Sequence, residues 1–198
     1  MKDITTKEIK SLRDLTGVSV MQCKGALEEA GGDMAKAILI LKKKSSDIAT
    51  KKGSRELGSG TVASYIHSNG NIGAMVLLSC ETDFVAKNEE FKMLAYDIAM
   101  QVAATNPEFL SRDNIGKDKI LAVREILEKE MLGLKKDKAM LEKILDGKVD
   151  GYFKDKILTE QTFIKDESLT VKGLIEKFVQ KFGERIEVAR ISRFSSSN

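Results

Sequence analysis

The first 41 residues are divided by helix start and stop signals that lie so close together that only short helices fit between them. The start residues are Thr5, Ser19 and Asp33, and the stop residues are Gly17 and the pair 31–32. Ser, Thr and Asp accept hydrogen bonds from the free N–H groups of a helix start, whereas glycine adopts the left-handed backbone that ends a helix. In the first segment Ile9, Leu12 and Leu15 recur at helical spacing, which predicts one buried face. The pattern therefore predicts a module of three short helices over residues 1–44.

The segment that follows this module loses the helical periodicity and is strongly basic. Residues 42–55 hold six Lys or Arg side chains and one Asp, which gives a net charge of +5. We therefore predict a basic linker over residues 45–60. Two roles remain open for it, a solvated connector that its charge keeps extended or a surface that meets an acidic partner.

The remaining chain mixes strand and helix patterns. Asn69-Gly70 tolerates the positive φ angles of a tight turn and lies between two apolar runs, which predicts a hairpin of strands over 61–68 and 72–80, with His67 in the first strand. Helical spacing follows from about Asn88 to Pro107, and a third strand is expected after Gly183. The further predicted helices cover 117–132, 136–146 and 170–182, and the third strand covers 185–194. These elements predict an α+β fold, in which a small antiparallel sheet covered by helices forms a core domain over 61–194, followed by a tail at 195–198.

The candidates for catalytic chemistry are few. His67 has no second histidine or clustered cysteine with which to hold zinc, and no phosphate-binding glycine motif is present. Cys23 and Cys80 lack a CxxC spacing and are expected to pack in the core as reduced thiols. We therefore expect no catalytic residues, no metal site, no cofactor and no enzyme activity.

The charge and hydropathy of the chain indicate where it works. The N-terminus has no apolar run of a signal peptide, and no apolar run approaches the 18 or so residues of a membrane span, so a cytoplasmic protein without a membrane partner is expected. A net charge of +3 neither requires nor excludes a nucleic-acid partner.

One short stretch, "LSCETDFVAKNEEF", combines a strand end with a large apolar residue beside an acid. It contains Thr82, Asp83, Phe84 and Val85, and residues 81–87 are expected to form a loop between a strand and a helix. Two interpretations remain open from the residues alone. Phe84 folds back over the core while Asp83 caps a turn, or the loop displays both side chains for a partner.

The same stretch, read as "ETDFVAKNEEF", closely resembles the signature of the elongation factor Ts family. The segment "LRDLTGVSVMQCKGALEEAGGDMAKAILILKKK" is similar to the N-terminal helical module of that family, which is UBA-like, and "LTEQTFIKDESLTVKGLI" is similar to its C-terminal core pattern. The chain has one sheet subdomain where longer members have two, so it resembles the short form, which pairs as a homodimer.

The resemblance implies a function in translation elongation. It implies a guanine-nucleotide exchange factor that binds elongation factor Tu, both GDP-bound and nucleotide-free, and disturbs its magnesium and phosphate site. The implied exchange loop is Thr82, Asp83, Phe84 and Val85, with Phe84 as a wedge near the magnesium of the partner. Asp83 has two open roles, in that its charge disturbs the magnesium shell or its carboxylate holds the loop.

The resemblance also implies a second contact with the same partner through Arg13, Val20 and Met21 of the first module. Inward packing of Val20 and Met21 is the alternative for that surface. No direct nucleic-acid contact is expected from the family. Two other functions stay open, a ribosome-binding or RNA-binding module that uses the basic linker, and a UBA-type adaptor that uses only the first 40 or so residues.

Overall fold

The computed structural model describes residues 4–51, 55–131 and 137–196, and the side chains of all of these except 45–51. Three N-terminal helices are followed by a small antiparallel sheet with helices, so the predicted α+β class is confirmed. Packing divides the chain into two compact units. The first comprises Met1–Ala63, Val76–Asp97 and Gly173–Ala189, and the second comprises Ser64–Met75, Ile98–Lys172 and Arg190–Asn198. The domain boundaries expected from sequence differ from this division and stay a prediction.

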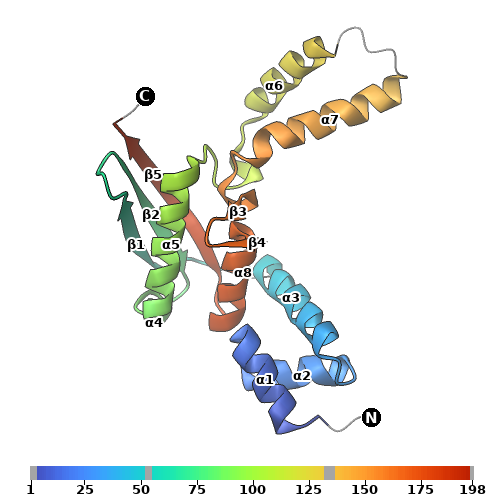
Figure 1. Ribbon diagram of the computed structural model, residues 1–198, viewed down its shortest axis with the longest axis vertical. Helices are drawn as coiled ribbons and strands as arrows, with labels where there is room; N and C mark the ends of the chain where they lie inside the picture. Colours follow the sequence, from blue (N-terminus) through green and yellow to red (C-terminus); the bar gives the residue numbers. More distant parts are fainter. Residues whose placement is uncertain (1–3, 52–54, 132–136, 197–198) are drawn as a thin grey trace. The chain divides into compact units, whose positions relative to one another are not determined.

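The N-terminal helices follow the start and stop signals of the sequence (Figure 1). They are α1 (Thr6–Thr16), α2 (Val20–Glu29) and α3 (Met34–Lys51). Thr5 and Glu8 form a complete capping box, and Gly17 ends α1 with a φ of 69°. The three helices bury one shared apolar core in which the side chains of Leu12, Val18, Cys23, Ala26, Leu27, Ala37 and Leu41 are almost fully buried.

Two expectations for this region are corrected. Leu15 is not on the buried face, because its side chain is 70% exposed. Val18 follows the left-handed turn at Gly17, and its side chain is only 2% exposed. It fills the core beyond Leu12 in place of Leu15. The helix α3 also continues to Lys51, so the expected linker is helical over its first seven residues, 45–51, and residues 52–54 lie outside the described part.

The main sheet has three strands in the order β1-β2-β5. They are β1 (Ser59–Ile66), β2 (Ile72–Cys80) and β5 (Ile186–Ser195). The predicted hairpin is confirmed, with Gly70 at a φ of 72° and a hydrogen bond of 2.7 Å from Gly70 N–H to the carbonyl of His67. His67 itself lies just after β1 in the turn rather than within the strand, because the strand already ends at Ile66.

Three helices adjoin these strands in the chain, two after β2 and one before β5 (Figure 1). They are α4 (Asp83–Ala86), α5 (Glu89–Thr105) and α8 (Val171–Phe182). The expected loop at 81–87 therefore contains one helical turn. Gly183 ends α8 with a φ of 70°, as predicted. Within the first unit, the buried Gln180 of α8 donates its side-chain amide to the carbonyl of Leu41 at 3.1 Å, so α8 is held against the end of the helical module's core.

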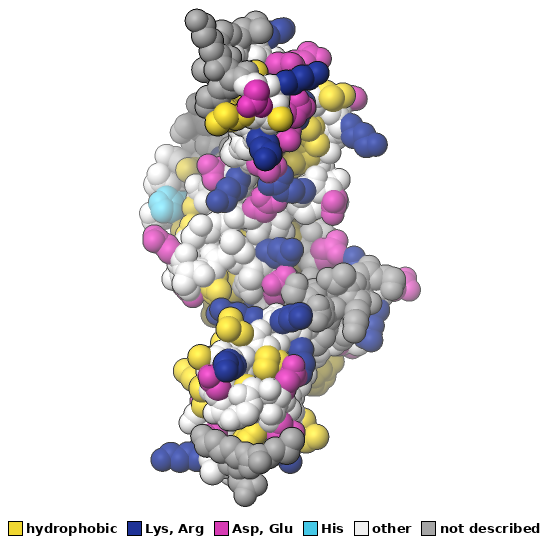
Figure 2. Space-filling model, turned by 90° about the vertical axis from the view of Figure 1, so that its right-hand side faces the viewer, with side chains coloured by type: hydrophobic (Ala, Val, Ile, Leu, Met, Phe, Trp, Pro, Cys, Tyr) yellow, Lys and Arg dark blue, Asp and Glu magenta, His cyan; other side chains and the backbone are white. Residues whose placement is uncertain are grey.

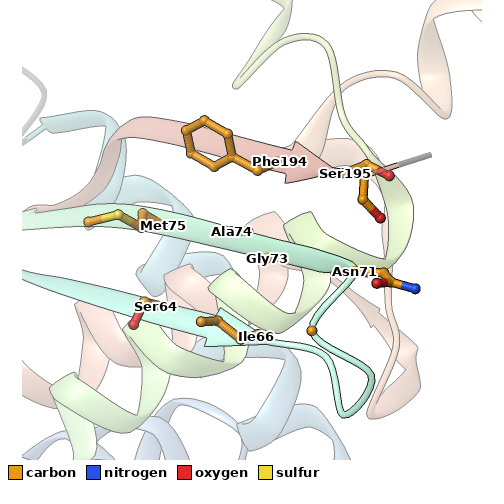
Figure 3. A pocket seen from close by; sticks show the side chains of 10 residues that line it. Ser64, Ile66, Asn71, Gly73, Ala74, Met75, Phe194 and Ser195 are labelled. Carbon is orange, nitrogen blue, oxygen red and sulfur yellow. The ribbon is translucent and has the colours of Figure 1, made fainter. Parts of the chain in front are cut away.

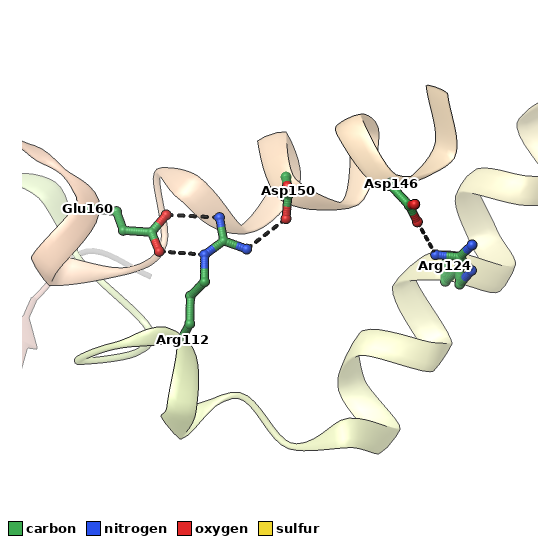
Figure 4. Close-up of polar contacts among 5 residues, drawn as sticks. All are labelled: Arg112, Arg124, Asp146, Asp150 and Glu160. Carbon is green, nitrogen blue, oxygen red and sulfur yellow. Dashed lines mark hydrogen bonds and ion pairs between the residues drawn. The ribbon is translucent and has the colours of Figure 1, made fainter. Parts of the chain in front are cut away.

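The second unit contains a helical hairpin formed by α6 (Lys117–Glu130) and α7 (Lys138–Lys154). The patterns at 117–132 and 136–146 predict both helices, although α7 is longer than expected and residues 132–136 lie outside the described part. Ion pairs join the elements around the hairpin, because Arg112 of η1 (Arg112–Asn114) binds Asp150 and Glu160, and Arg124 of α6 binds Asp146 of α7 (Figure 4).

A second, two-stranded sheet was not predicted from the sequence. Its strands are β3 (Thr162–Phe163) and β4 (Asp166–Thr170), and they follow the short helix η2 (Leu158–Glu160). The pairing is antiparallel with an irregular register between Thr162 and Phe163, which leaves no run of alternating residues long enough to detect in the sequence.

Candidate partner-binding site

The exchange-loop residues of the sequence lie where β2 ends and α4 begins. The side chain of Phe84 is 81% exposed, which makes the interpretation of Phe84 as a core residue wrong. Val85 and Ala86, the next two residues, are buried and hold the turn to the unit. The structure therefore displays Phe84 on a turn whose opposite side belongs to the core. The side chain of Val85 faces that core. A contact of Val85 with a partner stays a prediction, and it would have to involve the backbone of Val85 rather than its side chain.

The N-terminal end of the turn is held by Glu184, which lies just after α8. The backbone N–H and the hydroxyl group of Thr82 both donate to its carboxylate, at 3.0 and 2.6 Å. Thr82 is the N-cap of α4, yet its side chain makes no capping hydrogen bond, because its hydroxyl is committed to Glu184. The thiol of Cys80 donates to the carbonyl of Thr82 at 3.2 Å and adds a contact on the sheet side.

The C-terminal end of the turn is held from β1. The hydroxyl of Thr61 donates to the carbonyl of Ala86 at 2.8 Å. This carbonyl belongs to the last residue of a four-residue helix, which has no following turn of its own to satisfy it. The apolar side chain of Phe84 thus projects from between two hydrogen-bonded anchors.

Asp83 shares the exposed surface with Phe84. Its carboxylate pairs with Lys87 Nζ at 2.6 Å, and both side chains are largely exposed. The hydrogen bond and the charge of Lys87 lower the pKa of Asp83 below its ordinary value, so the carboxylate is ionised at neutral pH. An ionised Asp in the first turn of a helix also favours the helix dipole. The structure is therefore consistent with a loop-supporting role of Asp83 and leaves its charge at the surface.

Glu81 forms the second connection between this loop and the segment after α8. Its carboxylate accepts a hydrogen bond of 2.6 Å from the backbone N–H of Arg185 and pairs with Arg55 Nη1 at 2.8 Å. Arg55 also accepts, through its carbonyl, a hydrogen bond of 2.6 Å from the Arg185 guanidinium. One residue of the expected linker therefore contacts the base of the loop. Glu81, Glu184 and Arg185 were not predicted as site residues, since pairing over more than 100 positions leaves no local signal in a single sequence.

The second expected contact surface lies around the turn at Gly17. Val20 and Met21 are both exposed, Met21 at 78%, so the alternative that they pack inward is wrong. Arg13 is also exposed, and Leu15 adds a further apolar side chain on the same short helical module. Ser19 caps α2 by accepting a hydrogen bond from Gln22 N–H, which fixes the start of the helix that carries Val20 and Met21. The module thus exposes the apolar side chains of Leu15, Val20 and Met21, and the basic Arg13 precedes them in the sequence.

The cysteines are placed as expected, in the core. Cys23 and Cys80 are free thiols without solvent exposure. Burial raises the pKa of both, that of Cys80 to about 11, where the nearby carboxylate of Glu184 contributes as well. A thiol with such a pKa is a poor nucleophile at neutral pH.

The possible metal ligands, and the charge on one face of the molecule, bear on other kinds of site. Among residues 4–44, 55–131 and 137–196, no three His, Cys, Asp or Glu side chains are grouped to hold a metal ion. No helix of the described residues is long and apolar enough for a membrane crossing. Figure 2 shows Lys and Arg side chains interspersed with Asp and Glu on the face in view, rather than collected into one basic surface.

An exposed phenylalanine beside an ionised carboxylate, on a turn anchored at both ends, is typical of residues that bind another protein. The fold and the site together therefore indicate the class of partner-binding proteins. Comparison with known proteins places it more narrowly, since residues 6–198 match the family model described as Elongation factor TS.

Curated relatives agree over nearly the whole chain. A protein named Elongation factor Ts from Desulforamulus reducens is 45% identical over 194 residues, which cover 98% of this chain and 89% of the relative. Proteins of the same name from Carboxydothermus hydrogenoformans and Thermodesulfovibrio yellowstonii are 46% and 47% identical over 191 residues, covering 96% of this chain and 88% and 95% of the relatives. The chain belongs to the elongation factor Ts family and is a translation elongation factor.

Proposed function

We propose that this elongation factor binds elongation factor Tu and accelerates the release of GDP by inserting Phe84 beside the nucleotide-bound magnesium ion. Mg²⁺ demands near-ideal octahedral geometry and is held through the nucleotide phosphates and a few protein groups. A large apolar side chain that displaces those groups weakens the binding of magnesium and nucleotide together. The observation that carries the proposal is the exposure of Phe84, 81%, on a turn that is anchored on both sides.

Asp83 acts in the same contact in one of two ways. Its charge disturbs the magnesium shell of the partner, or its carboxylate only holds the loop through the ion pair with Lys87. Substitution by Asn separates these roles, because Asn keeps a hydrogen-bond acceptor for Lys87 and removes the charge.

Exchange by this mechanism is reciprocal. A factor that loosens GDP from its partner is itself loosened by GDP to the same extent. A hundredfold effect corresponds to about 2.8 kcal/mol of coupling, at about 1.4 kcal/mol per tenfold change. Arg13, Val20 and Met21 provide a second contact in this proposal, which keeps the partner bound while the nucleotide leaves.

We also propose that the chain forms a homodimer through the exposed face of its sheet. A hollow of about 520 Å³ lies there within the second unit, and Figure 3 shows Ile66, Met75 and Phe194 around it, on β1, β2 and β5. All three side chains are about half exposed or more, and the lining is mainly apolar. An exposed apolar face of this kind supports a symmetric contact in which two copies bury it.

The test of the exchange proposal is Phe84→Ala. Burying a phenylalanine side chain in a partner contributes about 1.5 to 3 kcal/mol, so we expect the maximal rate of GDP release to fall by about 10- to 100-fold. The measurement is stopped-flow release of fluorescent GDP from elongation factor Tu at increasing concentrations of the factor. Because Phe84 is exposed, the free energy of unfolding should change by no more than about 0.5 kcal/mol.

Leu121→Ala is the matched control, since Leu121 is also an exposed apolar residue but lies on α6 in the other unit. The control should exchange at the rate of the unmodified protein. A well-folded Phe84→Ala protein with undiminished exchange would refute the role of Phe84 as the wedge.

A further inference from the structure

The turn that carries Phe84 cannot hold its own conformation. The helix α4 has four residues, far fewer than the 12 or so that an isolated helix needs for even marginal stability. Its N-cap residue also gives no side-chain capping bond to the helix. The direction in which Phe84 projects is therefore set by contacts with the rest of the first unit.

Glu184 makes the hydrogen bonds at the N-terminal end of the turn. One carboxylate accepts both the backbone N–H and the hydroxyl of Thr82, so two of its hydrogen bonds fix the backbone and the side chain of a single residue. Hydrogen bonds to an ionised acceptor are shorter and stronger than neutral ones. Thr82 lies two residues before Phe84, close enough for its backbone orientation to decide where the phenylalanine points.

Glu81 precedes Thr82 and Arg185 follows Glu184, and these two neighbours form the same kind of hydrogen bond in the opposite direction. The carboxylate of Glu81 accepts the backbone N–H of Arg185, while the carboxylate of Glu184 accepts the backbone N–H of Thr82. Each of the two adjacent pairs, 81–82 and 184–185, thus gives one acid and one backbone donor to the other. We call these four residues the reciprocal clasp.

The clasp is placed by the end of α8. Gly183, with a φ of 70°, ends the helix and turns the chain so that Glu184 and Arg185 run back toward the loop. Phe182 packs edge to face on Phe91 of α5, with 6.4 Å between ring centroids, and Lys181 pairs with Glu90. Glu184 and Arg185 of the clasp therefore follow directly on a segment that is fixed to the start of α5.

We infer that Glu184 is a positioning residue for nucleotide exchange, which orients Phe84 by holding Thr82 and makes no contact with the nucleotide itself. This inference rests on the proposed function of Phe84 and names the residue that makes it effective. It separates the affinity for the partner from the rate of exchange. Without Glu184 the exposed surfaces remain, whereas the wedge samples directions that do not reach the magnesium site.

The first experiment compares Glu184→Ala with Glu187→Ala. Glu187 is the matched control, because its exposed carboxylate pairs with the side chain of Arg185 and does not contact Thr82. We expect Glu184→Ala to lower the maximal rate of GDP release from elongation factor Tu by about tenfold, the effect of losing charge-assisted hydrogen bonds, while the half-saturating concentration changes less than twofold or so. Glu187→Ala should leave both unchanged. An undiminished maximal rate for Glu184→Ala would overturn the inference.

The second experiment asks whether Glu184 acts through Phe84. In a double-mutant cycle, Glu184→Ala should cost less than about twofold more when Phe84 is already alanine. A full tenfold further loss in that background would show an independent role and would contradict the inference. If Phe84→Ala alone leaves the rate of GDP release unchanged, the proposed function fails. If Phe84→Ala lowers that rate and Glu184→Ala does not, only the inference about Glu184 fails.

A readout that does not use exchange comes from the free protein. Hydrogen exchange at the amide of Thr82 should speed up in Glu184→Ala and not in Glu187→Ala, since only the former removes the acceptor. Unchanged protection of that amide would also overturn the inference. Glu184→Gln and Thr82→Val keep part of the contact. Their maximal rates of GDP release should lie between those of the unmodified protein and Glu184→Ala. All variants are compared at a temperature at which circular dichroism shows them folded, so these milder changes decide the question if Glu184→Ala melts early.

Discussion

Phe84 shows how much binding free energy a single exposed side chain can contribute. Its exposed ring is a hydrophobic cost in the free protein, and burial in a partner returns about 1.5 to 3 kcal/mol. That range includes the 2.8 kcal/mol or so that a hundredfold exchange effect requires. One correctly oriented side chain is therefore sufficient in energy, which makes its orientation the property that the surrounding residues must supply.

Cys80 gives a second prediction at the residue scale, with its sign fixed by burial. The folded protein holds the pKa of Cys80 at about 11, above the ordinary value of 9.0, so the thiol form is favoured by folding. The stabilisation is complete below pH 9 and is lost as the pH rises toward 11. We expect iodoacetamide to label Cys80 slowly at neutral pH in a Cys23→Ala background, and the rate to reach half its maximum near pH 11.

The denatured protein is the control for this labelling. In denaturant Cys80 should react with the pH dependence of an ordinary thiol, with a midpoint near 9. A folded protein that labels with the same midpoint would show that Cys80 is accessible and that the thiol is not protected by burial.

At the scale of elements, the hairpin of α6 and α7 shows which forces hold a helix pair. Phe153 is buried in the apolar core of the hairpin, whereas Arg112 makes ion pairs at its surface with Asp150 and Glu160. Exposed ion pairs contribute about 0 to 1 kcal/mol, because the charges are screened and the side chains lose entropy. We expect Phe153→Ala to lower the free energy of unfolding by about 3 to 5 kcal/mol and Arg112→Met by about 1 kcal/mol or less.

Urea unfolding at low and high salt checks this ranking. The effect of Arg112→Met should shrink as salt is added, whereas that of Phe153→Ala should not. A larger loss for Arg112→Met than for Phe153→Ala would show that the ion pairs, and not the apolar core, hold the hairpin.

The elements that the sequence predicts correctly are those with local signals. The capping box at Thr5, the helix end at Gly17, the hairpin at Asn69-Gly70 and the helix end at Gly183 each depend on residues within four positions of one another. The prediction of a buried Leu15 is wrong, because helical spacing shows a face but not how far the core extends along it. The sheet of β3 and β4 was missed since its strands are short and irregularly paired.

The candidate site divides in the same way. Asp83 and Phe84 stand in the sequence as an acid and a large apolar residue after a strand, a pattern that leaves two interpretations open, and only the family resemblance implies that they bind a partner. The residues that hold the turn, Glu81 with Arg185 and Thr82 with Glu184, interact over more than 100 positions. Tertiary contacts of this length carry no periodicity, so only the folded structure reveals them.

At the scale of the whole molecule, the homodimer is the prediction with the clearest physical test. Ile66 and Phe194 belong to an exposed apolar hollow of the sheet, so a charge placed there would remain solvated in a monomer but be buried and unpaired in a dimer. We expect the unmodified chain to sediment as a dimer at micromolar concentration and Phe194→Asp to sediment as a monomer.

Met93→Asp is the control for this substitution, because Met93 is an exposed apolar residue on α5 and does not line the hollow. It should leave the dimer intact. A monomeric unmodified protein with full exchange activity would contradict the dimer proposal, and a dimer that survives Phe194→Asp would move the interface to another surface.

The reciprocal clasp has a consequence for when the protein becomes active during its own synthesis. Thr82 is translated 102 residues before Glu184. At about 5 to 20 residues per second, the turn with Phe84 is therefore complete about 5 to 20 s before the carboxylate that orients it exists. Under the proposed mechanism, a nascent chain on the ribosome carries Phe84 in that interval without a fixed direction, and we expect it to reach its full exchange rate only when the last helix and the residues after it have been added.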